Sequence, residues 1–342
     1  MSKSFIKITD GSYRNTDVSG QVFRLADQFK STNKGAYVTV YNDNKFMGMP
    51  EKLRVKVNNM KDYEFVSEDN FNEVVNTNEE PFDEEKRMSE IRERFDILTD
   101  MTTACIAGDI RAMIVSGPPG VGKSYGVEKE VDKATLFDQL ADRPLKAEVV
   151  KGSTSAIGLY TTLYKYSDEN CMLVFDDCDS VLVDDVCLNL LKGALDSGKK
   201  RKISWLADSN LLRREGVPDS FEFKGSVVFI TNLKFENVRS QKMRDHLDAL
   251  QSRCHYLDLT LDTMQDKMLR IKQIAGDGAL FEGYNFSQEQ QDSIIKFMET
   301  NKNKLREMSL RMALKIGDLV KSFPDRWEAM ALVTCAKGAS AK

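Results

Sequence analysis

Apolar and polar residues alternate along the first 66 residues of the chain. The alternation is clearest in four short segments, 5–8, 21–25, 37–41 and 53–57, which are separated by turns rich in Gly, Asn and Asp. Alternation with a period of two is typical of β-strands that bury one face. We therefore predict a small all-β domain, a β-barrel, over residues 1–66.

The pattern changes twice in the residues that follow. Residues 67–83 are acidic, rich in Asn and interrupted by Pro81, which is the composition of a linker. From Glu84, apolar residues recur at helical spacing, at Met88, Ile91, Phe95, Leu98 and Met101. This spacing predicts a helix that leads into a second domain.

Short, continuous apolar runs characterise residues 84–261. They lie at 113–115, 147–150, 171–175 and 225–232. Runs of this length indicate strands that are buried on both faces of a parallel sheet, and a helix is expected around 159–166. We predict an α/β core for this region.

Helical spacing returns after residue 261. The candidate helices lie at 263–275, 287–301 and 305–323. Residues 262–342 are therefore expected to form a small α-helical domain followed by a C-terminal tail.

One glycine-rich segment separates the first apolar run of the core from a predicted helix. Its residues are Gly117, Pro118, Pro119, Gly120, Val121, Gly122, Lys123, Ser124 and Tyr125. Glycines let the backbone fold around an anion, and the N–H groups of the loop and of the helix N-terminus attract phosphate. Lys123 would place its charge on the β- and γ-phosphates, and the Ser124 hydroxyl suits Mg²⁺. A Gly/Pro turn after a buried strand explains the glycines but not the Lys-Ser pair.

A pair of carboxylates follows another apolar run. Asp176 and Asp177 come directly after 171–175, so a buried strand would deliver them to the sheet edge where ligands bind. In this Walker B arrangement Asp176 would hold Mg²⁺ and Asp177 would orient and polarise the attacking water. An ordinary Asp-Asp turn after a strand is the lesser alternative.

Composition restricts the class of protein. The 342 residues are 41% hydrophobic and carry a formal charge of −4, which excludes a uniformly basic nucleic-acid binder. The six cysteines have no CxxC spacing, which argues against a zinc site. Because the chain has only two histidines, it is also not expected to contain a His-based metal site or a nucleophile–His pair. No apolar run approaches the ~20 residues of a membrane span, and the first residues lack a signal-peptide core. We expect a soluble, cytoplasmic protein without membrane partners.

Residues 84–330 as a whole resemble an AAA+ ATPase. Besides the phosphate loop and the Asp pair, Asn232 is similar to the family's sensor-1 residue, Arg253 in the segment 248–254 to its arginine finger, and Arg311 in 308–311 to its sensor-2 arginine. The resemblance implies ATP hydrolysis to ADP and phosphate, ATP and Mg²⁺ as cofactors, a lid formed by residues 262–342, and a ring or open ring of identical subunits, with six expected. The catalytic set that it implies is Lys123, Asp176, Asp177, Asn232, Arg253 and Arg311.

Two features depart from the AAA+ pattern. The acid pair is Asp-Asp where the family more often has Asp-Glu, which shortens the catalytic base. Residues 155–159 lack the aromatic side chain that grips polypeptide in ring-shaped unfoldases, and Tyr160 follows them.

In the N-terminal domain, residues 6–23 resemble a KOW-type motif, whose barrel commonly binds nucleic acid or a protein surface. This resemblance implies a protein or nucleic-acid partner at residues 1–66, which carry a net charge of +4, although a barrel that only packs against its neighbour is equally consistent.

Three functions remain open at this stage. The first is an ATP-driven motor or remodeller that acts on DNA or on replication and recombination complexes, as a helicase or loader. It would contact DNA through two basic loops, which contain Lys199, Lys200, Arg201, Lys202, Arg213 and Arg214. The others are an ATP-driven protein unfoldase and a nucleotide-gated scaffold. Solvated turns explain the basic loops equally well.

Overall fold

The computed structural model describes residues 4–13, 16–32, 35–42, 51–67, 83–238, 240–261 and 263–337. The chain divides into two compact units, Met1–Asp83 and Glu84–Lys342. Residues 68–82, which make up most of the predicted linker, lie outside the described part. None of the described helices is both long enough and apolar enough to cross a membrane.

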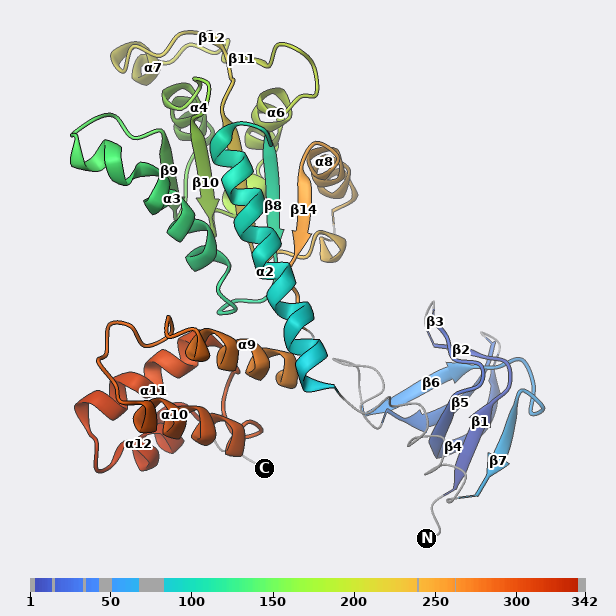
Figure 1. The fold of residues 1–342 in the computed structure, drawn as a ribbon. Coiled ribbons are helices and arrows are strands. Elements are labelled where there is room, and N and C mark those ends of the chain that lie inside the picture. Colours follow the sequence, from blue (N-terminus) through green and yellow to red (C-terminus); the bar gives the residue numbers. More distant parts are fainter. Residues whose placement is uncertain are drawn as a thin grey trace. The chain divides into compact units, whose positions relative to one another are not determined.

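The N-terminal unit is an antiparallel sheet, which confirms the all-β prediction (Figure 1). Its strand order is β3-β2-β6-β5-β4-β1-β7. The bounds are β1 Phe5–Ile8, β2 Ser12–Tyr13, β3 Thr16–Asp17, β4 Val22–Thr32, β5 Gly35–Tyr41, β6 Lys52–Lys56 and β7 Tyr63–Val66. The cross-strand pairs Val38–Val55 and Val40–Leu53 are buried in its core, and the alternate residues of β6 are exposed. The resemblance to a KOW-type barrel stays a prediction.

The second unit contains a five-stranded parallel sheet in the order β14-β8-β13-β10-β9. The strands are β8 Ala112–Ser116, β9 Ala147–Lys151, β10 Met172–Asp176, β13 Ser226–Thr231 and β14 His255–Asp258. Every residue of β8, β10 and β13 is buried, because helices cover both faces of the sheet. The α/β fold class is confirmed.

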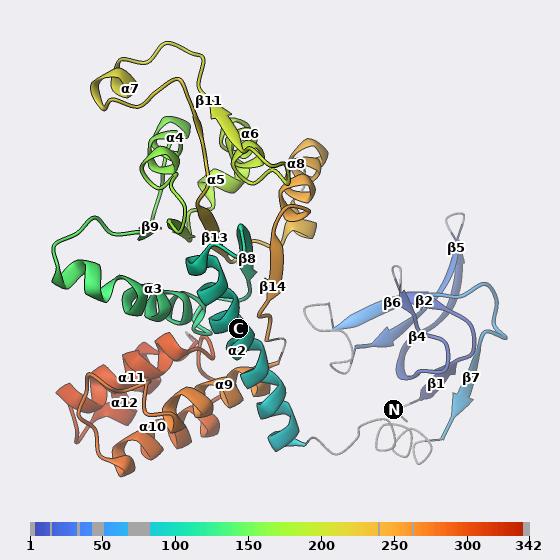
Figure 2. The same cartoon turned by 45° about the horizontal axis from the view of Figure 1, so that its top comes forward.

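Helices α2 and α3 contribute to one core against the sheet, and α4, α6 and α8 contribute to the core on its other face (Figure 2). Their bounds are α2 Glu84–Ala107, α3 Lys123–Leu140, α4 Ala156–Lys165, α6 Asp185–Ala194 and α8 Gln241–Gln251. Shorter elements connect them: α5 Ser180–Val183, α7 Asn210–Arg214, the 3₁₀ helix η1 Phe235–Asn237, and the hairpin of β11 Lys202–Ser204 with β12 Ser220–Glu222.

Four helices form the lid beside the carboxyl ends of the sheet strands (Figure 1). They are α9 Met264–Gly276, α10 Gln288–Thr300, α11 Leu310–Ser322 and α12 Trp327–Thr334. The expectation that the third helix begins at Leu305 is wrong. Leu305 instead pairs with Ala336 in an isolated bridge, and the Ser309 side chain accepts a hydrogen bond from the Met312 N–H, so α11 begins at Leu310.

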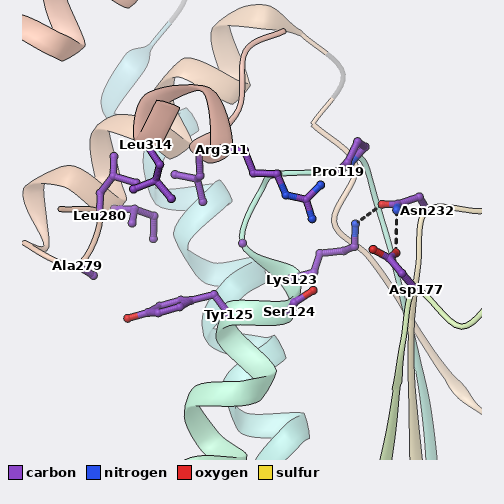
Figure 3. Close-up of a pocket in the computed structure, with 14 residues that line it drawn as sticks. Pro119, Lys123, Ser124, Tyr125, Asp177, Asn232, Ala279, Leu280, Arg311 and Leu314 are labelled. Atoms are coloured by element: carbon purple, nitrogen blue, oxygen red, sulfur yellow. Dashed lines mark hydrogen bonds between the residues drawn. The ribbon is translucent and has the colours of Figure 1, made fainter. Parts of the chain in front are cut away.

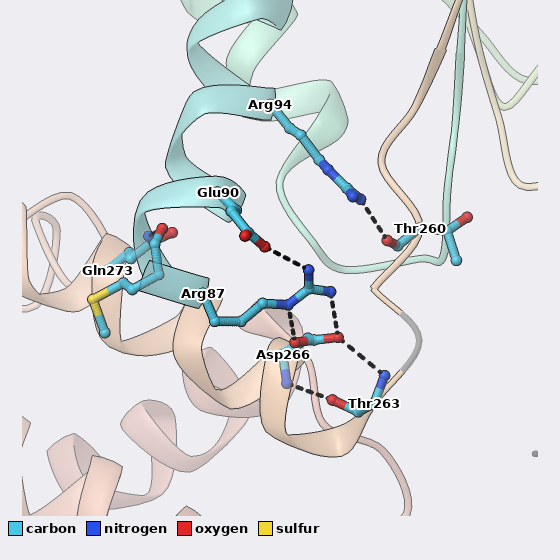
Figure 4. Close-up of polar contacts among 8 residues, drawn as sticks. Arg87, Glu90, Arg94, Thr260, Thr263, Asp266 and Gln273 are labelled. Atoms are coloured by element: carbon cyan, nitrogen blue, oxygen red, sulfur yellow. Dashed lines mark hydrogen bonds and ion pairs between the residues drawn. The ribbon is translucent and has the colours of Figure 1, made fainter. Parts of the chain in front are cut away.

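Polar contacts join the lid to the core helix α2 (Figure 4). The Arg87 guanidinium donates to both carboxylate oxygens of Asp266, at 2.7 and 3.0 Å, and to Glu90 at 2.9 Å. Burial alone would raise the pKa of Asp266, but the hydrogen bonds and charge of Arg87 lower it. Asp266 also belongs to a capping box with Thr263 at the start of α9. One paired carboxylate therefore fixes both the start of the lid and its attachment to α2.

Candidate nucleotide-binding site

The glycine-rich loop connects β8 to α3, and the lid lies directly against it. Gly120 and Gly122 have φ angles of 73° and 102°, in the left-handed region that glycine adopts without strain. A Cβ at Gly120 would stand 2.7 Å from the Cβ of Ser309, and the Leu310 N–H donates to the Gly120 carbonyl at 2.8 Å. The glycines thus allow the first residues of α11 to approach the loop.

The Lys123 amine is held at the mouth of this loop. It donates to the carbonyls of Gly117 and Pro118 at 2.7 and 2.9 Å and to the Asn232 Oδ1 at 2.8 Å. Burial lowers the pKa of Lys123 to about 8, against the opposing charges of Asp177 and Asp176. The amine is therefore a partly desolvated cation whose present partners are neutral oxygens, and an anion in the loop would interact with it more strongly.

The two carboxylates lie at the carboxyl end of β10. The Asp176 Oδ1 accepts a hydrogen bond from the Ser124 hydroxyl at 2.8 Å, and its Oδ2 is 3.9 Å from the Lys151 amine. Burial raises the pKa of Asp176 because it disfavours the charged carboxylate, and the hydrogen bond from Ser124 opposes this shift. Asp177 adopts a left-handed φ of 52°, and its Oδ1 accepts from the Asn232 Nδ2 at 2.8 Å. Asn232, which follows β13, therefore connects Asp177 to Lys123 through its amide side chain.

Most of these groups line one pocket of about 290 Å³, but Asp176 does not belong to its lining. Its polar end contains Lys123, Ser124, Asp177, Asn232 and Arg311, and Figure 3 shows Arg311 pointing from the start of α11 toward Lys123. The other end is apolar and comes mainly from the lid. The remaining lining residues are Pro119, Gly120, Gly122, Tyr125, Ile274, Ala279, Leu280, Leu310 and Leu314.

No protein-family model matches the chain. A curated relative does: the chain is 36% identical, over 249 residues, to an uncharacterised 36.7 kDa protein in the nrdC–mobD intergenic region of Enterobacteria phage T4. The match covers 72% of this chain and 75% of the phage protein. The chain belongs to the same family as this phage protein.

Three solved structures with low sequence identity share some backbone similarity with this chain. They are the replication initiator DnaA bound to AMPPCP and single-stranded DNA (10% identity, TM-score 0.38, 66% of this chain and 60% of that one), a DNA replication initiation factor (10%, 0.35, 67% and 60%), and the S. cerevisiae Hsp104:casein complex in its extended conformation (14%, 0.37, 72% and 38%). The chain spans less than two thirds of each.

Some residues of the predicted phosphate loop do not line the pocket. Gly117 and Pro118 line a separate hollow on the other side of Asn232, together with Lys234 and Lys267. Val121 is buried in the core between α2, α3 and the sheet. The loop turns around Lys123, so its successive residues face different surroundings: Gly117 and Pro118 face the separate hollow, and Val121 faces the core.

Arg253 does not line the pocket of its own chain. It lies in the turn between α8 and β14, donates from Nη1 to the Ala249 carbonyl, and places Nη2 4.0 Å from Asp196. Its Nε is buried and has no hydrogen-bond partner among the residues that the structure describes. The carboxylate beside Arg253 is therefore that of Asp196, which lies just after α6.

One of the predicted DNA-contacting cations is buried. Arg201 is 8% exposed, donates from Nη1 to the carbonyls of Ala194 and Gly225, and stacks on the Phe223 ring. Burial lowers the pKa of Arg201 to about 10. The expectation that Arg201 contacts DNA is therefore wrong: the residue holds the β11–β12 hairpin to the core. Lys199, Lys200 and Lys202 are exposed.

The second basic segment is exposed but paired. Arg213 forms an ion pair with Asp208, and Arg214 lies 3.4 Å from Glu215. Surface pairs of this kind contribute about 0–1 kcal/mol, so they are easily exchanged for phosphate.

Tyr160 is completely buried. Its hydroxyl donates to the Pro218 carbonyl at 2.8 Å, and its ring packs against Trp205 and Phe221. A tyrosine in this position stabilises the hairpin and does not present an aromatic surface to a polypeptide.

Several pocket residues were not predicted from the sequence. Leu314 lies one helical turn beyond Leu310, a spacing that indicates a shared face of α11. Ala279 and Leu280 follow α9 in a connection without a recognisable signal. Lys151, at the end of β9, was also missed, although its strand ends at the same sheet edge as Asp176.

Proposed function

We propose that residues 84–342 bind ATP with Mg²⁺ and hydrolyse it to ADP and phosphate. The observation that carries this proposal is the convergence of Lys123, Ser124, Asp177, Asn232 and Arg311 at one end of a pocket whose other end is apolar. Phosphates would occupy the charged end, against the N-terminus of α3. The adenine base of ATP would lie at the apolar end, between Tyr125 and the leucines of the lid.

The donor set at the end of β10 fits Mg²⁺. The Ser124 hydroxyl and the Asp176 carboxylate are hard oxygen ligands that already lie within hydrogen-bond distance. When bound, Mg²⁺ would neutralise charge on the β- and γ-phosphates. Lys151 stands outside this pair, where it forms a 2.7 Å ion pair with Glu128 on α3.

In the proposed reaction, Asp177 accepts a proton from water as the water oxygen bonds to the γ-phosphorus. The bond from that phosphorus to the β–γ bridging oxygen breaks, and ADP leaves with this oxygen. Asn232 is hydrogen-bonded to both Asp177 and Lys123, so it would align the water with the phosphate. Lys123 and Arg311 would stabilise the negative charge that develops on the transferred group.

We propose that a second copy of the chain completes the site with Arg253. Within the described part of its own subunit, this side chain contacts one backbone carbonyl and a carboxylate at 4.0 Å, which together hold it weakly. An arginine finger supplied in trans contributes about 10³ to 10⁵ in rate. The assembly would be a ring or open ring, with six subunits expected.

The macromolecular substrate that we favour is DNA or a DNA-bound complex. Lys199 and Lys200 lie in the turn before β11 and Lys202 is the first residue of that strand, and these three exposed cations can follow a phosphate backbone without reading bases. A polypeptide-threading activity is less well supported, because Tyr160 is buried. A nucleotide-gated scaffold would bind ATP at the same pocket but would not turn it over.

ATP turnover by the full chain tests these functions together. We expect ATPase activity per subunit that rises with protein concentration, is stimulated by DNA more than by unfolded protein, and is lost in Lys123→Ala and in Arg253→Ala. A mixture of the two inactive variants should regain activity, since some interfaces then combine an intact loop with an intact Arg253. Tight ATP binding without turnover would favour the scaffold, and normal turnover by Arg253→Ala would exclude the shared site.

A further inference from the structure

The separate hollow beside the phosphate loop shares one residue with the nucleotide pocket. Asn232 lines both of them. The hollow has a volume of about 210 Å³, and its lining contains two lysines and no carboxylate. Gly117 and Pro118 of the loop, Asn232, Thr260, Lys234 and Lys267 belong to this lining.

The wall between the hollow and the pocket consists of the groups that hold Lys123. The Lys123 amine donates to the carbonyls of Gly117 and Pro118 at 2.7 and 2.9 Å and to the Asn232 Oδ1 at 2.8 Å. All three of these partners line the hollow, and Figure 3 shows Asn232 joined to both Lys123 and Asp177. The position that we propose for the γ-phosphate is therefore separated from the hollow by a single layer of residues.

The two lysines of the hollow come from different elements. Lys234 lies in the connection between β13 and η1 and is exposed, and Lys267 lies in the first turn of α9 and is half-buried. Neither amine has a hydrogen bond or an ion pair within the part of the chain that the structure describes. Two adjoining carboxylates are already engaged: Asp258 accepts from the Thr260 N–H at 2.8 Å, and Asp266 is paired with a guanidinium of α2. The hollow therefore carries positive charge that attracts an anion.

We infer that this hollow binds the inorganic phosphate that hydrolysis releases, before the phosphate reaches solvent. The inference rests on the proposed ATPase activity. ADP would still occupy the loop and the apolar end of the pocket, whereas the hollow adjoins Lys123 directly. The oxygens of a phosphate ion can accept hydrogen bonds from both lysine amines. The hollow is smaller than the nucleotide pocket, which suits an ion of this size better than a second nucleotide.

Asn232 would connect this site to the reaction. Its Nδ2 donates to the Asp177 Oδ1 at 2.8 Å, and in the proposed reaction Asp177 becomes protonated. A neutral carboxyl group accepts a weaker hydrogen bond than a carboxylate does. Hydrolysis would therefore loosen the Asn232 amide at the moment when phosphate has to pass it on the way to Lys234 and Lys267.

Thermal unfolding of the full chain, with Mg²⁺ and saturating ADP, tests whether the hollow binds phosphate. Inorganic phosphate is titrated against chloride at constant ionic strength. Its exclusion from protein surfaces stabilises every variant without saturation, so the saturable part of the stabilisation measures binding. Lys234→Gln/Lys267→Gln should raise the half-saturating concentration on the order of 10-fold, because each exposed cation contributes up to about fivefold. The matched control is Lys296→Gln/Lys302→Gln, which neutralises two exposed lysines on and just after α10 and should bind phosphate as the wild type does.

Dimethyl phosphate distinguishes the two sources of such an anion. It carries the single charge and the two ester bonds of a nucleic-acid backbone phosphate, and it should give no saturable stabilisation at concentrations where inorganic phosphate does. Equal binding of the two anions, or an equal loss of phosphate binding in the Lys296/Lys302 control, would overturn the inference.

Transient kinetics tests the role in product release. Chemical quench measures hydrolysis, and a fluorescent phosphate-binding protein measures free phosphate under the same conditions. In Lys234→Gln/Lys267→Gln, hydrolysis should proceed at the wild-type rate, and phosphate release should be slowed on the order of 10-fold. Release that follows hydrolysis as closely in this variant as in the wild type would overturn the inference. Absence of hydrolysis in the wild type would overturn the proposed function and with it the role in release, and the unfolding titration would still decide whether the hollow binds phosphate.

Discussion

The two ends of the pocket are built in different ways. The polar end, which is the proposed phosphate end, comes from one contiguous loop, from side chains at the carboxyl ends of β10 and β13, and from Arg311 at the start of α11. Hydrogen bonds link Lys123, Asn232 and Asp177 in a chain. The apolar end has no such network. It is assembled from α9, α11 and the segment between α9 and α10, and it depends on how the lid packs against the loop.

This difference indicates a division of labour. A hydrogen-bonded constellation on rigid strands is suited to a reaction that requires accurate positioning. An apolar surface on a separate helical layer contributes affinity in proportion to its buried area and can move with the lid. We therefore expect changes at the phosphate end to affect hydrolysis most, and changes at the apolar end to affect affinity.

The largest effect should come from Asp177→Asn. The amide retains the shape of the side chain but does not accept a proton, so hydrolysis should fall by about 10²- to 10⁴-fold while ATP binding is retained. Asp176→Asn should instead weaken Mg²⁺-dependent nucleotide binding, since it removes a charged oxygen ligand. Single-turnover hydrolysis and nucleotide titrations with and without Mg²⁺ measure the two effects. Equal loss of nucleotide in both variants would contradict the separate roles.

A smaller, selective effect is expected at the apolar end. Leu314→Ala removes a partly buried lining residue and should weaken ATP binding about 10- to 200-fold, as expected for losing ~1–3 kcal/mol of apolar contact. Inorganic tripolyphosphate, which has no base, should bind the variant and the wild type equally. Leu332→Ala, on the exposed side of α12, is the matched control. If tripolyphosphate affinity falls together with ATP affinity, the two ends are not separable.

The sequence predicted the site residues that lie in the glycine-rich loop or at the ends of apolar runs. Asp176 and Asn232 could be placed near Lys123 because each ends an apolar run, and the carboxyl ends of parallel strands meet at one sheet edge. Arg201 was misplaced because a run of basic residues reads as solvated, whereas β11 pairing and the Phe223 ring enclose this one. Leu280 carries no signal at all, since its position depends on how the lid packs.

The smallest effect concerns the protonation of Lys123 at the phosphate end. Its pKa of about 8 in the free protein means that the amine loses its proton as the pH rises through this value. Bound ATP favours the charged form of the amine and therefore raises the pKa of Lys123. When the amine is neutral in the free protein, it must take up a proton as ATP binds. Affinity should therefore be constant below about pH 8 and should then fall by up to about tenfold per pH unit.

Titration calorimetry between about pH 7.5 and pH 9.5 measures both the affinity and the proton uptake. Lys123→Arg serves as the control, because a guanidinium keeps its charge throughout this range even if it binds ATP more weakly. Its affinity should not vary with pH, and its binding should release or take up no proton at this position. Leu314→Ala should retain the full pH dependence of the wild type, since this substitution removes no ionisable group and leaves Lys123 in place. A wild-type affinity that is flat up to pH 9.5 would mean that Lys123 is fully charged in the free protein and that its burial does not tune the phosphate end.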